Sequence, residues 1–223
     1  MTIKSSEKRR EESNNLIKQL GITCYENLSL VEDQTQVALK NPDKIAKRAI
    51  ASLLSIQLAC DIGNNVQDIK KSKDITKKLL NHYDVYDELL ESEKALFLEN
   101  PNKQNAINVV WTYEAYWALV WALGLVEDIG WPNKIVDGLE AIKLLQKSKD
   151  YEDFKSKIKM RDIEEVLDKL DLFYRLHWAC VNKRIDSKTE IKDLNPEVVM
   201  ERRRGLEWLV SPLDDWNEIP LHT

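Results

Sequence analysis

Apolar residues recur every three to four positions along most of the chain, which is the spacing of one face of an α-helix. The clearest helix starts are two Asn-Pro-acid triplets, at 41–43 and 195–197, where an N-cap precedes a proline and an acid. Residues 22–40 sustain no period, so a loop or one short helix is expected there. The pattern predicts helices at about 5–20, 41–63, 73–82, 84–90, 92–99 (capped by Ser92), 102–124, 134–147, 150–157, 160–184 and 195–210.

Short connections between successive helices predict an all-α fold without a sheet. The six glycines and six prolines are too few for a turn-rich β-protein. A chain of 223 residues is long enough for one large domain or two small ones. We expect a single-domain multi-helix bundle over residues 1–223, in which an N-terminal helical part, about 1–65, packs on a core of 102–210.

The helix at 102–124 is the most apolar and forms the expected centre of the bundle, with Trp111, Trp117 and Trp121. Its segment 109–126 contains only two polar residues, Thr112 and Glu114, and has the minimal length of a membrane span. A glutamate in hydrocarbon would cost a few kcal/mol, so we interpret the segment as a buried helix. Glu114 is therefore expected to be buried and to bind an Arg or His from one of the last two long helices.

Three acids share one stripe of the helix at 160–184, because Glu164, Asp168 and Asp171 follow each other at helical spacing. Apolar residues flank this acidic stripe on both sides, so it cannot face bulk water entirely. Like charges at this spacing repel, and Arg175 relieves only Asp171. The remaining acids are expected to bind a cation from elsewhere in the chain.

The last helix carries three consecutive arginines that point in different directions. Helical spacing puts Arg202 inside the apolar face, between Leu206 and Leu209. Arg203 is expected at the edge of that face, and Arg204 opposite it. Because a buried unpaired charge is prohibitive, we predict that Arg202 pairs with the acidic stripe, with Arg203 in reserve.

Tyr174 and His177 lie on the broad apolar arc of the helix at 160–184, and Cys180 follows one turn later. His177 is either a core residue with one hydrogen bond or an acid–base group, and Cys180 either a small buried hydrophobe or its partner in a dyad. The candidate polar network is a structural ion-pair network, a ligand pocket or an active site. It comprises Glu114, Glu164, Asp168, Asp171, Tyr174, Arg175, His177, Arg202 and Arg203.

Composition narrows the classes of function. A net charge of −5 argues against nucleic-acid binding, and the lysine-rich run at 70–78 is typical of a solvated face. Three distant cysteines without a C-x-x-C pair, and a polar N-terminus, favour a cytoplasmic protein without a signal peptide. No Glu-x-x-His pair or other metal or cofactor motif occurs, so no metal, cofactor or membrane partner is expected. The oligomeric state stays open.

The chain resembles the domain-of-unknown-function family DUF4272 over nearly its whole length. The matching segments occur in the family's order: Arg10 and Ser13, then 20–22, 45–49, Trp111, 114–115, 121–124, 164–178, 201–203, 208–209 and 215–216. Ser29 stands where the family commonly has a proline, and Asn217 where it usually has an acid. The resemblance implies a discrete helical domain and points to the same polar residues, but it implies no reaction.

Three functions follow as hypotheses. The first is a non-enzymatic protein, of the adaptor or immunity type, that binds another macromolecule. The second is a binder of a small anionic ligand held by Arg175, Arg202 or Arg203. The third is a hydrolase-type enzyme that uses an acid of the stripe or His177 as general acid or base.

Overall fold

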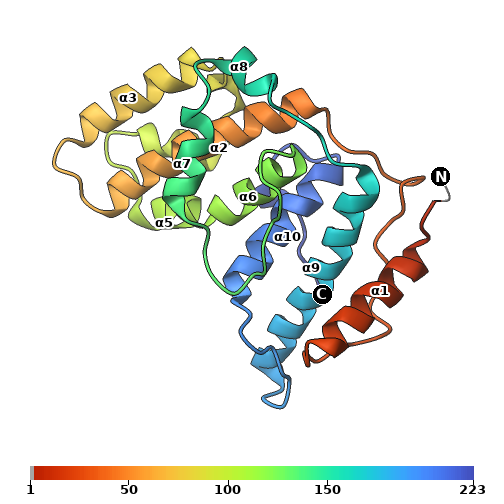
Figure 1. Ribbon diagram of the computed structural model, residues 1–223. Helices are drawn as coiled ribbons and strands as arrows, with labels where there is room; N and C mark the ends of the chain where they lie inside the picture. Colours follow the sequence, from red (N-terminus) through yellow and green to blue (C-terminus); the bar gives the residue numbers. More distant parts are fainter. Residues whose placement is uncertain (1–2) are drawn as a thin grey trace. The chain divides into compact units, whose positions relative to one another are not determined.

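A computed structural model describes residues 3–223 of the chain (Figure 1). Helices account for 61% of these residues and they include no β-strand, so the predicted all-α fold is confirmed. The chain divides into two compact units. The first contains the chain up to Lys40, Ile129–Ile135 and Arg161–Thr223, and the second contains Asn41–Asp128 and Val136–Met160. Residues 1–65 thus contribute to both units, and the expectation of one single domain stays a prediction.

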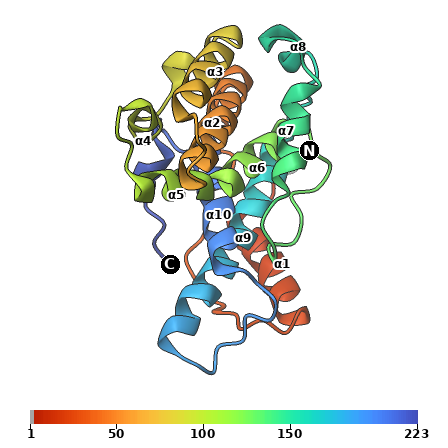
Figure 2. The ribbon, with the colours of Figure 1, turned by 90° about the vertical axis from the view of Figure 1, so that its left-hand side faces the viewer.

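The first unit is built on α9 (Ile163–Ile185), which contacts α1 (Ser6–Gln19) and α10 (Pro196–Val210). Figures 1 and 2 both show α1 running alongside α9. The core of this unit is apolar and close-packed around Leu167, Leu170, Phe173, Leu176, Val199, Leu206, Trp208, Leu209 and Trp216. A 3₁₀ turn, η3 (Trp216–Glu218), closes the unit after α10.

The second unit surrounds α2 (Pro42–Gly63), which contacts α3 (Ile69–His82), α5 (Lys103–Trp111) and α6 (Tyr113–Ala122). Most residues of α2 are buried, as expected for a helix covered by others along most of its length. The remaining elements of the second unit are shorter: η1 (Tyr86–Glu88), α4 (Glu91–Lys94), η2 (Ala95–Phe97), α7 (Gly138–Gln146) and α8 (Tyr151–Lys155).

The capping residues explain why the long helices begin where the sequence predicts. The side chains of Asn41, Asn102 and Asn195 each accept a hydrogen bond from a backbone N–H of the first turn. Gly21 and Gly124 follow helix ends with φ of +70° and +69°, a conformation that favours glycine.

Three predictions of local structure are wrong. The expected helix at 102–124 is two helices, α5 and α6, separated at Thr112, whose hydroxyl donates to the carbonyl of Val109 at 2.6 Å. This competing bond is a known way for threonine to interrupt a helix. The expected helix at 84–90 is only the 3₁₀ turn η1. The helix expected at 92–99 with Ser92 as its N-cap begins earlier, as α4: its N-cap is Leu90, whose N–H donates to the Glu93 carboxylate, and Ser92 lies inside the helix. Residues 22–40 form a loop.

Candidate functional site

The acidic stripe of α9 begins with Glu164 and Asp168, and α1 supplies their cations. Arg9 donates from Nη2 to Glu164 and from Nε to Asp168 Oδ1 at 2.9 Å, while Lys4 Nζ donates to Asp168 Oδ2 at 2.6 Å. The Arg9 side chain is 1% exposed, whereas those of Glu164 and Asp168 are 24% and 39% exposed. The guanidinium therefore lies under two acids whose side chains are partly exposed, although Glu164 Oε1 itself is buried.

Sequence reasoning missed Arg9, although a signal was present. Arg9, Ser13 and Ile17 follow each other at helical spacing, and all three are buried. An arginine in line with the buried Ile17 on an otherwise polar helix indicates an inward guanidinium. The sequence had assigned this role to Arg202, and that assignment is wrong.

Arg202 is buried, as its position between Leu206 and Leu209 predicts, but it binds elsewhere. Its Nη1 donates to the backbone carbonyls of Ile129 and Gly130 at 2.9 and 3.0 Å. The stripe's cations are instead Arg9, Lys4 and Arg175.

The third acid of the stripe, Asp171, forms a closed pair with Arg175 within α9. Arg175 donates from Nε to Oδ2 at 2.8 Å and from Nη2 to Oδ1 at 2.7 Å, the two-pronged geometry that arginine favours. The side chains are 0% and 2% exposed. Arg175 Nη2 also donates to the Ser29 carbonyl at 3.3 Å, so the pair attaches the 22–40 loop to α9.

Arg203, His177 and Tyr174 form a second cluster between α9 and α10. The Arg203 guanidinium lies 4.5 Å from the centre of the Tyr174 ring and 2.9 Å from His177 Nδ1, and it also donates to Glu207. Burial, together with the positive charge of Arg203, lowers the pKa of His177 to about 4. His177 is therefore neutral near pH 7 and accepts the hydrogen bond from Arg203 at Nδ1.

Two expectations for the last helix need correction. Arg203, expected at the edge of the apolar face, is buried in the core. Arg204 does not point freely into solvent: it donates to Glu201 at 3.0 Å and to the Trp216 carbonyl at 3.2 Å. Glu207 was missed, although it stands four residues after Arg203, the usual spacing of a helical ion pair.

Glu114 belongs to the second unit, on α6, and is 1% exposed. Its Oε1 accepts a hydrogen bond from the backbone N–H of Val136 at 2.6 Å. The neighbouring residues of α6 are buried on every side, which explains why this carboxylate does not reach water. The expected Arg or His donor to Glu114 stays a prediction.

Comparison with known families identifies the chain. The sequence profile of the family described as "Domain of unknown function (DUF4272)" matches residues 9–219. The chain belongs to the DUF4272 family. No curated protein and no solved structure matches it. The match covers parts of both units of this DUF4272 chain and every network residue named above except Lys4, which precedes it.

Burial and ion pairing limit the reactions that the polar side chains of this DUF4272 chain can take part in. Burial raises the pKa of the Cys180 thiol to about 12, so it is not a thiolate nucleophile near pH 7. The Asp171 carboxylate is occupied on both oxygens by Arg175. Within residues 3–223, no group of three His, Cys, Asp or Glu residues is placed to hold a metal ion. Nor does this part of the chain contain a helix long and apolar enough to cross a membrane.

Proposed function

We propose that this DUF4272 chain is a non-enzymatic protein of the adaptor or immunity type, which acts by binding another protein. The state of the polar network supports a structural role for it. Asp171, Arg175, His177 and Arg203 are buried and bound to one another or to neighbours on the same unit. Glu164 and Asp168 are partly exposed, but Arg9 already binds both of them. A substrate would need an exposed acid or base that is not held in an ion pair, and a small anion would need an exposed guanidinium.

The observation that carries the proposal is the outward face of α5. Ile107 and Trp111 stand one helical turn apart and are 46% and 37% exposed. Two exposed neighbours on this helix, Gln104 and Asn108, are uncharged, and the Gln104 amide donates to Asn108 at 3.0 Å. The exposed Lys103, one turn before Ile107, donates to the side chain of Asn65 at 2.6 Å. Exposed tryptophan flanked by aliphatic and neutral polar groups is typical of the centre of a protein interface.

The proposal places the protein in the cytoplasm. Cys24, Cys60 and Cys180 are all free thiols, which supports a reducing compartment. Cys24 donates its thiol proton to the side-chain oxygen of Asn14 at 3.1 Å, so this thiol has a structural role in the 22–40 loop.

A photo-crosslinking experiment tests the α5 face. A crosslinking residue is placed at position 107 of the full chain, with position 78 on α3 as the exposed control. We expect one discrete adduct in native extract from position 107 and none from position 78. An excess of unlabelled wild-type chain should compete with the adduct, and the Ile107→Glu variant should not. A ladder of adducts, or equal competition by both chains, would refute binding through this face.

A further inference from the structure

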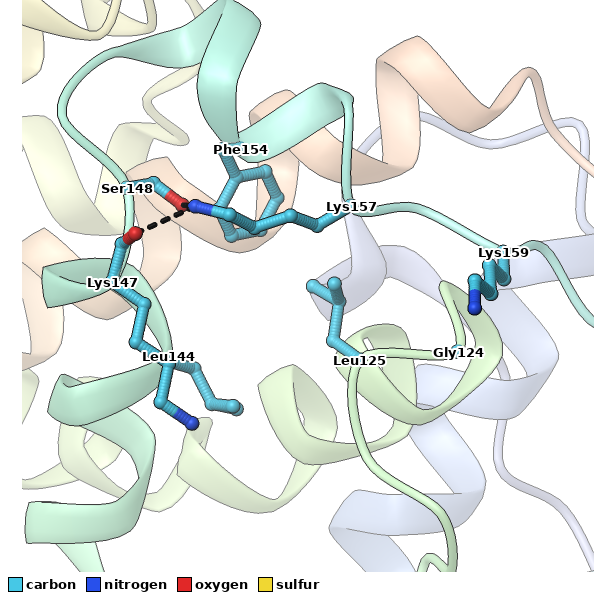
Figure 3. A pocket seen from close by; sticks show the side chains of 8 residues that line it. All are labelled: Gly124, Leu125, Leu144, Lys147, Ser148, Phe154, Lys157 and Lys159. Carbon is cyan, nitrogen blue, oxygen red and sulfur yellow. Dashed lines mark hydrogen bonds between the residues drawn. The ribbon is translucent and has the colours of Figure 1, made fainter.

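The second unit contains a hollow of about 220 Å³ that no part of the proposed function uses. It lies between the end of α6, the C-terminal half of α7 and the segment that follows α8 (Figure 3). Three lysines line it, Lys147, Lys157 and Lys159, together with the apolar side chains of Leu125, Leu144 and Phe154. This is a local excess of positive charge in a chain whose net charge is −5.

The backbone fixes one wall of the hollow. Lys159 N–H donates to the Leu123 carbonyl at 3.0 Å, and Gly124 follows with φ of +69°. A Cβ at position 124 would lie 2.2 Å from the Lys159 carbonyl oxygen, so only glycine permits this close approach. The backbone of Lys159 is therefore held beside the end of α6 by main-chain contacts that do not involve its side chain.

The three ammonium groups are in different states. Lys157 is occupied: its Nζ donates to the Lys147 carbonyl at 2.6 Å, to Ser148 Oγ at 2.8 Å and to Asp153 at 3.0 Å. This lysine satisfies a carbonyl at the C-terminal end of α7, which is a structural role. The side-chain ammonium groups of Lys147 and Lys159 make no hydrogen bond or ion pair to any residue in the range 3–223.

The positions of the Lys147 and Lys159 ammonium groups restrict the kind of ligand that the hollow can bind. Figure 3 shows Lys147 and Lys159 on opposite sides of the hollow, with Leu125 and Leu144 between them. A volume of about 220 Å³ is large enough for a small ligand of several non-hydrogen atoms. We propose that the hollow binds a small dicarboxylate, with one carboxylate at each free lysine and a short aliphatic chain against the leucines.

Calorimetric titration of the full chain with glutarate tests the proposal. We expect saturable binding to the wild-type chain, and roughly tenfold weaker binding for Lys147→Gln and for Lys159→Gln, because each variant loses one charge-assisted hydrogen bond. Lys149→Gln removes an exposed lysine from the same region that does not line the hollow, and it should bind as the wild type does. An equal loss in all three variants would indicate general screening and overturn the site.

Two further sets of titrations distinguish binding of a dicarboxylate from binding of other anions. Butyrate has a similar chain but one carboxylate, and inorganic phosphate has no chain; each should bind at least about tenfold more weakly than glutarate. Leu144→Trp fills the hollow without changing its charge and should abolish binding while the chain keeps its helical circular dichroism. Equal binding of butyrate or phosphate, no binding of glutarate, or unchanged binding by a folded Leu144→Trp variant would each overturn the proposal. These results do not depend on the α5 face.

Discussion

The start and the middle of α9 carry the same kinds of charged residue in different surroundings. At the start, Glu164 and Asp168 bind Arg9 of another helix and remain partly exposed. In the middle, Asp171 binds Arg175 of the same helix, and both are buried. Water and salt reach the first cluster but not the second, so similar ion pairs should differ in energy, in salt dependence and in their response to pH.

The difference also separates two structural roles. The start of α9 joins two elements, because its acids hold α1, whose buried residues are polar apart from Ile17. The middle of α9 is part of the core, where the Asp171–Arg175 pair organises the 22–40 loop and His177 accepts from α10. Removing Arg175 leaves the Asp171 carboxylate buried, whereas removing Arg9 leaves two acids that are partly exposed.

The largest effect is expected from Arg175→Ala, which leaves the Asp171 carboxylate buried and unpaired. We expect the free energy of unfolding to fall by about 3–5 kcal/mol, measured by denaturant melts. The double variant Arg175→Met with Asp171→Leu is the control: it removes both charges and should cost much less than Arg175→Ala. If the double variant is as unstable as the single one, packing rather than the unpaired charge explains the loss.

His177 should make the stability of the first unit depend on acid pH. Its pKa falls from 6.5 to about 4 on folding, so between these values the unfolded chain binds more protons than the folded chain. The free energy of unfolding should therefore decrease as pH falls from 6.5 to 4, by up to about 3 kcal/mol at one pKa unit per 1.36 kcal/mol. The carboxylates add their own pH dependence in the lower part of this window.

The His177→Gln variant isolates the contribution of the imidazole. Stability is measured for both chains at pH 6.5, 5.5 and 4.5. The slope between pH 6.5 and 5.5 should be clearly smaller for the variant, because most carboxylates are still ionised there. Identical slopes for both chains would mean that His177 titrates normally in the folded protein.

A smaller effect is expected from Arg9→Ala, although Arg9 is as buried as Arg175. Its partners Glu164 and Asp168 can turn to water, so the loss should be about 1–2 kcal/mol, much of it from the aliphatic stem of the arginine. Denaturant melts in 1 M salt should narrow the gap between variant and wild type. Arg10→Ala, on the next and less buried position of α1, is the matched control and should stay within about 0.5 kcal/mol.

The sequence was sufficient to predict what depends on neighbours along one helix. The Asn caps, the burial of Glu114 and Arg202, and the Asp171–Arg175 pair all follow from local spacing. Local spacing could not decide which of several residues from distant segments binds a given side chain. Arg9 and Arg202 were both inward arginines, and only the packing of α1 on α9 decides that Arg9 meets the stripe. Similarly, the hollow at Lys147 and Lys159 depends on the close approach of Lys159 to the end of α6, and Gly124 is the sequence feature that permits it.

The smallest effect is expected from Lys4→Ala, at the exposed end of the α1 contact. Lys4 bridges Asp168 at 2.6 Å and Glu12 at 2.9 Å, but all three side chains are at least 27% exposed. Exposed pairs of this kind contribute about 0–1 kcal/mol, and a Debye length near 3 Å at 1 M salt removes most of that. We therefore expect a loss of at most about 0.5–1 kcal/mol at low salt and no measurable difference from wild type at 1 M. A loss that persists in 1 M salt would show that Lys4 stabilises α1 by packing, and the contrast between the start and the middle of α9 would then rest on Arg9 alone.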